Sequence, residues 1–179
     1  MIFYAPDCKM QYSDYTLSEL ESKHCIKVLR KVNGDKIELV NGIGGQFECV
    51  IIDDHYKKCK VKIMKHTHHE PQEKELHIAM AIPKSSDRLE WFLEKATELG
   101  ITKLSIINCA NSERRTINQK RLEKIVISAL KQSKRFYLPK IEDPIPFLKF
   151  IENEPNGYIG HCYKGNKTHA RSISKVAPI

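Results

Sequence analysis

A strand–helix–strand pattern across residues 76–108 is the feature that most constrains the fold of this chain. Residues 76–82 form an almost unbroken apolar run, as expected of a strand covered on both faces. Helical spacing of apolar residues follows up to position 99, and Gly100 suits the left-handed residue that often ends a helix. Residues 101–108 return to a buried-strand pattern. Two strands joined in this way predict an α/β domain with a parallel sheet.

Capping residues indicate where two helices of this domain begin. Asp87, with Glu90 three residues on, is similar to a capping box with aspartate as the cap. Asn118 can cap the next helix, where Ile117 and Leu122 are spaced as a hydrophobic staple. Both helices are therefore predicted to begin beside these residues.

The last part of the chain is predicted to add a third strand to the sheet. Pro139, Pro144 and Pro146 interrupt the helical pattern. A short helix over residues 146–152 and a strand over residues 158–163 are expected after them. The result would be a narrow sheet of three parallel strands with an exposed edge.

The amino-terminal part of the chain has a different pattern. Apolar and polar residues alternate in short runs, as in half-buried strands, and turn-forming residues separate these runs. The runs are residues 36–40, 47–52 and 59–64. A short helix is expected over residues 18–30. This pattern predicts a small β-barrel over residues 1–70, followed by the α/β domain over residues 71–179.

A histidine-rich run separates the two patterns. His66, His68 and His69 are followed by Glu70, in a polar stretch at residues 66–75. The run could be a solvated linker or a metal site. Consecutive ligands in a loop rarely complete a four-ligand shell. A linker is therefore favoured, and no metal site is predicted.

Charge and composition favour a nucleic-acid partner. Residues 112–140 hold nine lysines and arginines against two acidic residues, in a chain with a net charge of +8. Such a local surplus is typical of a surface that binds a polyanion. The six cysteines form no Cys-x-x-Cys pair, so they are expected to be reduced and mostly buried. No stretch has the pattern of a signal peptide or a membrane span, which predicts a cytoplasmic protein.

The candidate binding residues are cations and one glutamine, at two places in the predicted α/β domain. One group follows the predicted strands, at the edge of an open α/β sheet where ligands bind. It comprises Lys84, Arg88, Arg114 and Arg115. The other group lies on the polar side of the helix that follows Asn118. It comprises Arg121, Lys124, Gln132 and Arg135. The alternative is that any of these is an ordinary solvated charge.

The motifs at these residues resemble those of the RsmE family, the small-subunit ribosomal RNA uridine-N3 methyltransferases, and most resemble its branch found in Bacteroidetes. The resemblance spans essentially the whole chain in order. Its first part is the segment 24–30 with Gly34 and Asp35. Its later parts are Lys84, Arg88, the run 94–100, the Ser-Glu-Arg motif at 112–114, Arg121, the run 129–133 and Pro139.

The resemblance implies a PUA-like β-barrel joined to a SPOUT methyltransferase domain with a trefoil knot. It also implies S-adenosylmethionine as methyl donor, a homodimer, and a uridine of 16S ribosomal RNA as substrate. His24, Lys27 and Arg30 join the predicted RNA-binding residues on this basis. His161, Cys162 and Tyr163 are the predicted flank of the cofactor site.

Two departures from the family pattern shape these expectations. The family's glycine-rich cofactor loops would lie after Ile179, so the chain itself is expected neither to bind S-adenosylmethionine tightly nor to methylate RNA. The segment at Met1 also lacks the arginines that many members carry there.

No residue is predicted to take the N3 proton. The alternatives are a non-catalytic RNA-binding module and a protein-interaction scaffold.

Overall fold

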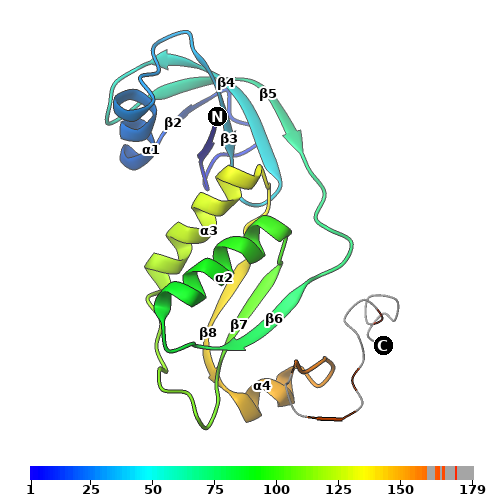
Figure 1. The fold of residues 1–179 in the computed structure, drawn as a ribbon. Coiled ribbons are helices and arrows are strands. Elements are labelled where there is room, and N and C mark those ends of the chain that lie inside the picture. The colour runs from blue at the N-terminus through cyan, green and yellow to red at the C-terminus, as the bar shows by residue number, and fades with distance from the viewer. Residues whose placement is uncertain (161–163, 166, 168–171, 173–179) are drawn as a thin grey trace.

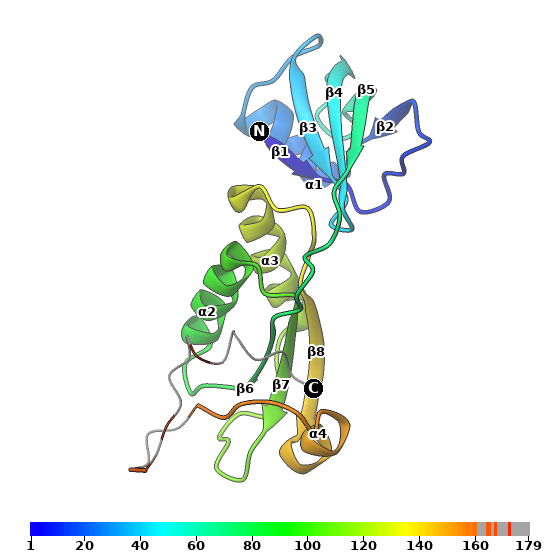
Figure 2. The same ribbon diagram turned by 90° about the vertical axis from the view of Figure 1, so that its right-hand side faces the viewer.

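The protein has two lobes, shown in Figure 1 and, turned by 90°, in Figure 2. The structure is a computed structural model that describes residues 1–160, 164, 165, 167 and 172. The amino-terminal lobe is a curved β-sheet with a short helix, and the second lobe is a sheet covered on one face by two helices. The first lobe therefore has the β structure, and the second the α/β structure, that the sequence patterns predicted.

The first lobe is built on a five-stranded sheet with strand order β1-β3-β4-β5-β2. Only the β1–β3 pair is parallel. Alternate residues of these strands point inward, as the alternating sequence pattern predicts, and bury a core that includes Phe3, Leu39 and Phe47. The strands are β1 (Ile2–Tyr4), β2 (Asp14–Thr16), β3 (Lys36–Val40), β4 (Gly45–Asp53) and β5 (Lys60–His68).

The predicted helix of this lobe is present in two pieces. Helix α1 (Glu19–Lys23) begins at Ser18, whose side chain accepts a hydrogen bond from the Glu21 N–H. A π-helical turn, η1 (His24–Val28), continues it. The segment ends at Arg30, which has a positive φ of 54°.

The second lobe is a three-stranded parallel sheet with order β6-β7-β8. Its strands are β6 (His77–Ala81), β7 (Lys103–Asn108) and β8 (Lys140–Pro146). Helices α2 (Ser86–Leu99) and α3 (Gln119–Ser133) pack on one face, and α4 (Phe147–Asn153) lies beyond the end of β8 (Figure 2). Leu93, Leu104 and Val126 lie in the core between the helices and the sheet.

The helix boundaries confirm most of the predicted caps. Gly100 ends α2 with φ of 96°, and Asn118 caps α3 by accepting a hydrogen bond from the Arg121 N–H at 3.1 Å. The cap predicted at Asp87 is wrong, because α2 begins two residues earlier and Ser85 is its N-cap. Asp87 instead lies in the first turn, where its charge is favourable to the helix dipole.

The third strand of the sheet is not where the sequence predicted it. Residues 140–146 form β8, although they include two prolines. Proline is tolerated there because β8 is an edge strand and its register with β7 shifts between Ser105 and Ile107, opposite Pro144. The predicted strand at 158–163 is wrong for residues 158–160, which have no regular structure. Residues 161–163 lie outside the described residues.

The predicted linker also begins too early. His66 and His68 lie in β5, paired with Phe47 and Gly45 across the sheet. The ladder continues there because β4 is equally long and offers it a partner. The connection between the lobes begins at His69. Among the described residues, no group of three or more histidine, cysteine or acidic side chains is placed to hold a metal ion.

Four of the cysteine thiols lie in the core of the first lobe. Cys8, Cys25, Cys49 and Cys59 are buried and free. Burial raises the pKa of the Cys8, Cys49 and Cys59 thiols to about 12. Because the thiolate is the reactive form, these groups serve as packing and not as nucleophiles.

Within the described part of the chain, no helix is long and apolar enough to cross a bilayer.

The face of the second sheet opposite the helices carries a network of polar side chains. Ser105 points to this face and donates a hydrogen bond of 2.6 Å to Glu142. His77 Nε2 lies 2.8 Å from the Ser105 hydroxyl, and Lys103 contacts both Glu142 at 3.4 Å and Glu154 at 2.8 Å. The Ser105 hydrogen bond and the neighbouring lysines lower the pKa of Glu142 to about 2. Burial lowers the pKa of His77.

We expect this network to make the protein less stable in acid. Because the pKa of His77 is lower in the folded state, stability falls as the pH drops below the unfolded value of 6.5. The Glu142 carboxylate stabilises the fold above pH 4.5, its unfolded pKa. This contribution is lost as the pH falls from 4.5 to about 2, its pKa in the folded protein. In urea unfolding, Glu142→Gln should flatten the decline below pH 4.5. The exposed Glu48→Gln should leave the decline as in the parent protein.

Candidate nucleic-acid interface

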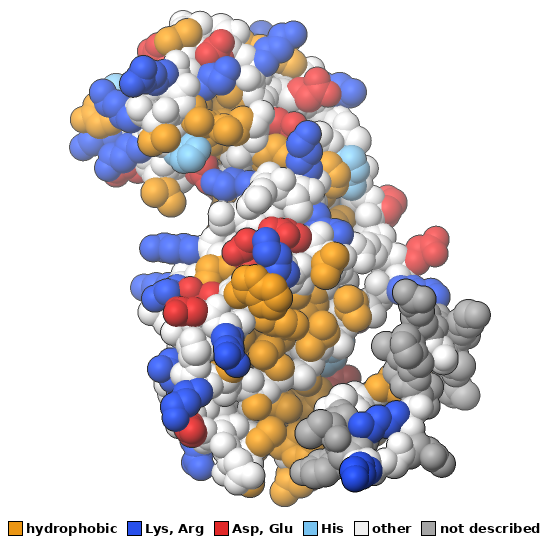
Figure 3. Space-filling view, in the orientation of Figure 1, with side chains coloured by type: hydrophobic (Ala, Val, Ile, Leu, Met, Phe, Trp, Pro, Cys, Tyr) orange, Lys and Arg blue, Asp and Glu red, His pale blue; other side chains and the backbone are white. Residues whose placement is uncertain are grey.

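Helix α3 presents a basic side to solvent. Leu122, Val126, Ala129 and Leu130 bury its apolar stripe, so the residues at the opposite angles are exposed. Arg121, Lys124 and Gln132 are among these exposed residues, as predicted. In the orientation of Figure 3, lysine and arginine side chains project along the left edge, over α3 and the loops at the lower end of the sheet.

The cations on this side differ in whether they are already paired. Arg121 contacts Glu90 of α2 at 2.6 Å, so it holds the amino ends of α2 and α3 together. Lys124 has no carboxylate within ion-pair distance among the described residues. Lys124 is therefore available to a phosphate.

The prediction that Arg135 continues the basic side of α3 is wrong, and its contact with RNA stays a prediction. Helix α3 ends at Ser133, and Lys134 takes a left-handed conformation with φ of 54°, which turns Arg135 off the basic side. Its Nε donates to the Glu98 carbonyl at 2.9 Å, at the carboxyl end of α2. A guanidinium at this position satisfies an unpaired carbonyl and suits the negative end of the helix dipole. Arg135 is therefore a structural cap of α2.

The cations predicted at the carboxyl ends of the strands are exposed. Lys84 follows β6, and its Nζ lies 3.5 Å from Glu113 in the loop after β7. The loops after these two strands therefore meet at this edge of the sheet. Arg114 and Arg115 lie next to Glu113 in the same loop. No described contact places Arg88, in the first turn of α2, against them, so the convergence of Arg88, Arg114 and Arg115 stays a prediction.

The predicted residues of the first lobe lie on and after η1. His24, Lys27 and Arg30 are all exposed. The His24 ring meets Phe3 edge-on at 6.0 Å between centroids. Lys27 Nζ lies 5.0 Å from the centre of the Tyr56 ring.

Family models match both lobes. A model described as an RNA methyltransferase domain matches residues 70–177, and one described as an RNA methyltransferase PUA domain matches residues 17–64. The first match alone spans more than half of the chain. The chain belongs to this RNA methyltransferase family. The predicted combination of a PUA-like domain and an α/β methyltransferase domain is therefore confirmed.

Relatives support the same assignment. The chain is 32% identical over 142 residues to the ribosomal RNA small subunit methyltransferase E of Rickettsia conorii, covering 77% of this chain and 58% of that protein. It is 30% identical over 153 residues to the protein of the same name from Buchnera aphidicola, covering 79% and 58%. The resemblance to the RsmE family is confirmed. The chain spans less than two thirds of the length of these relatives.

Solved structures share the fold. A probable rRNA methyltransferase from Porphyromonas gingivalis matches with a TM-score of 0.76 and 38% identity, covering 84% of this chain and 62% of that one. The ribosomal RNA small subunit methyltransferase E from Neisseria gonorrhoeae, solved bound to S-adenosyl methionine, matches with a TM-score of 0.74 at 22% identity, covering 84% and 63%. The second likeness shows the fold.

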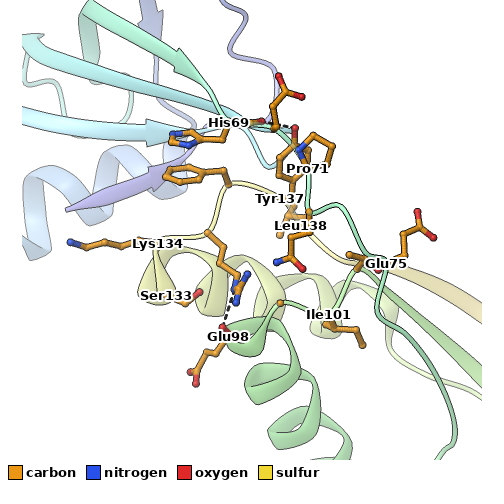
Figure 4. A pocket seen from close by; sticks show the side chains of 15 residues that line it. His69, Pro71, Glu75, Glu98, Ile101, Ser133, Lys134, Tyr137 and Leu138 are labelled. Carbon is orange, nitrogen blue, oxygen red and sulfur yellow. Dashed lines mark hydrogen bonds between the residues drawn. The ribbon is translucent and has the colours of Figure 1, made fainter. Parts of the chain in front are cut away.

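The cofactor residues predicted for this methyltransferase family member, His161, Cys162 and Tyr163, lie outside the described residues. A cavity of about 530 Å³ does open between the lobes (Figure 4). Its lining includes Glu75, Thr102 and Leu138, which come just before β6, β7 and β8. The cavity thus lies at the amino ends of the strands, whereas ligands of open α/β sheets bind at the carboxyl ends. We assign it no cofactor.

Sequence reasoning missed two features that join the two lobes. Lys131 of α3 contacts Glu21 of α1 at 2.7 Å, and the Glu21 side chain is only 7% exposed. The second feature is a contact between the loop at Gly42 and Gly44 and the segment after α3. In this segment the Tyr137 hydroxyl donates a hydrogen bond to the His69 carbonyl at 2.8 Å. The only sequence signal for the Glu21–Lys131 ion pair was an acidic residue within the short helix predicted over residues 18–30. The glycines were interpreted only as a turn.

Proposed function

We propose that the whole protein transfers a methyl group from S-adenosylmethionine to N3 of a uridine in 16S ribosomal RNA of the small ribosomal subunit. Membership of the RNA methyltransferase family and the names of the curated relatives support the reaction class and the substrate. No comparison favours the non-catalytic RNA-binding module. A homodimer stays a prediction from the resemblance, and a cytoplasmic location stays a prediction from the sequence pattern.

The exposed basic side of α3 is the observation that carries this proposal in the described residues. Lys124 is free of carboxylate partners in the described part of the chain, and Arg121 and Gln132 flank it on the same side. Phosphates of an RNA backbone are the ligands that such a side recognises, because each contact releases a condensed counterion. Lys84, Arg114 and Arg115 extend the positive surface beyond the amino end of α3.

The chemistry sets a further requirement on the substrate. Uracil N3 takes part in base pairing, so the target must be unpaired or extruded before the methyl group can reach it. The N3 proton leaves as the methyl group arrives, which develops negative charge on the ring. Cations at the carboxyl edge of the sheet, such as Arg114, would stabilise that charge electrostatically. S-adenosylmethionine would supply the methyl group from its sulfonium, and the neutral thioether S-adenosylhomocysteine would be the leaving group.

The basic side of α3 is tested by charge reversal at Lys124. We expect Lys124→Glu to weaken binding to a 16S rRNA fragment and to reduce the dependence of log K on log salt by about 1 per lost phosphate contact. Arg135→Glu, by contrast, should act through stability, because Arg135 caps α2. Filter-binding titrations over a range of salt concentrations measure the affinity for RNA and its dependence on salt.

Lys36→Glu on β3 is the matched control, because Lys36 is also exposed and has no carboxylate partner among the described residues. An equal loss of slope in both variants would mean that net charge, and not the α3 side, governs binding. Methyl transfer itself is tested with labelled S-adenosylmethionine and small subunits, using protein expressed from the complete gene. Label on any atom other than uridine N3 would refute the proposed reaction.

A further inference from the structure

An exposed tyrosine between β4 and β5 is surrounded by polar and cationic groups. Tyr56 lies in the turn at residues 54–59 and keeps 38% of its surface exposed. Lys27 Nζ lies 5.0 Å and Lys57 Nζ 5.8 Å from the centre of its ring. The His55 ring stacks on Tyr56 with 5.3 Å between centroids and 26° between planes. We call Lys27, His55, Tyr56 and Lys57 the Tyr56 platform.

The backbone on both sides of the Tyr56 platform is fixed. The Cys59 N–H donates to the Ser22 hydroxyl at 3.0 Å, and the Cys59 carbonyl accepts from the Leu17 N–H at 2.9 Å. On the other side, the His55 N–H donates to the Asp53 carboxylate at 3.0 Å. A surface held in this way loses little conformational entropy when it binds a ligand.

The carboxylates near the Tyr56 platform are already engaged. Glu19 pairs with Lys23 at 2.7 Å, and Asp54 accepts a backbone hydrogen bond from residue 33. Lys27 and Lys57 have no carboxylate within ion-pair distance in the described part of the chain. In Figure 3 lysine and arginine side chains also gather at the upper left, over the first lobe.

We propose that the Tyr56 platform binds single-stranded RNA, with one base stacked on Tyr56 and the flanking phosphates neutralised by Lys27 and Lys57. An aromatic ring stacks on any base, and lysines supply the sequence-independent attraction to the backbone. A duplex hides the faces of its bases, so the platform distinguishes unpaired from paired RNA. The inference rests on the proposed function, because methylation at N3 needs a target region that is not base-paired.

The test compares binding of a short fluorescein-labelled oligouridine and of an RNA duplex of the same length by fluorescence anisotropy. Tyr56→Ala should weaken oligouridine binding about five- to a hundredfold, the loss expected for one stacked base. Duplex binding should be unchanged. Tyr56→Phe should bind oligouridine like the parent protein, because it keeps the ring and removes only the hydroxyl.

Tyr12→Ala is the matched control, since Tyr12 is 40% exposed and no described lysine or arginine lies over its ring. Equal oligouridine affinity for the parent protein and Tyr56→Ala would overturn the platform while leaving the proposed function standing. An equal loss with Tyr12→Ala would overturn it as well. If the parent protein binds neither oligouridine nor the 16S rRNA fragment, the proposed RNA binding fails and the platform fails with it.

Discussion

Gly44→Ala is expected to lower the free energy of unfolding by roughly 2–5 kcal/mol, from left-handed backbone strain and overpacking together. Gly44 has φ of 93°, and a Cβ there would clash with the Tyr137 hydroxyl and lie 2.7 Å from the His69 carbonyl oxygen. The same residue holds the lobes together, because its N–H donates to the Phe136 carbonyl at 2.9 Å. Urea unfolding measures the loss.

Gly34→Ala separates the two causes. Gly34 has nearly the same φ, 90°, but a Cβ there meets nothing within 4 Å. It should therefore show only the backbone strain, about 1–2 kcal/mol. If both variants lose the same amount, the close packing at Gly44 contributes nothing to stability and the contact between the lobes is looser than described.

The second large effect is expected at the ion pair between the lobes. Lys131→Met should destabilise the protein by roughly 2–4 kcal/mol, because it leaves the Glu21 carboxylate buried without its partner. The expected loss is below that of a fully buried pair, since the Lys131 side chain is 25% exposed. One Glu21 carboxylate oxygen has no hydrogen-bond partner among the described residues even in the parent protein, which makes the site sensitive to losing the lysine. Thermal and urea unfolding report the change.

A double mutant shows whether the loss comes from the unpaired charge. Replacing both residues, as Glu21→Met with Lys131→Met, should restore much of the stability, because no charge is then left buried. Lys23→Met is the matched control, since Lys23 pairs with Glu19 in solvent and its loss should cost far less stability than the loss of Lys131. A double mutant no more stable than Lys131→Met would show that packing, and not charge, dominates this contact.

The basic side of α3 was predictable because it depends on local periodicity. The apolar residues Leu122, Val126 and Ala129 repeat at helical spacing, so the angles of Arg121 and Lys124 follow from the sequence. The pattern does not say where the helix stops. The left-handed Lys134 ends the helix before Arg135, and this one change of backbone conformation places Arg135 at the carboxyl end of α2 instead of on α3.

Contacts between distant residues were decided by the tertiary structure. Glu21 and Lys131 are 110 residues apart, and no local pattern links them. The prolines in residues 140–146 were expected to prevent a strand, yet these residues form β8, because β8 pairs with β7 along one edge only and a register shift accommodates Pro144. The sequence by itself determined the two domains, the strand–helix–strand unit and the exposed cations of α3, since these depend on the period of apolar residues. The pairing of β8 with β7 and of Glu21 with Lys131 depended on which surfaces the folded chain brings together.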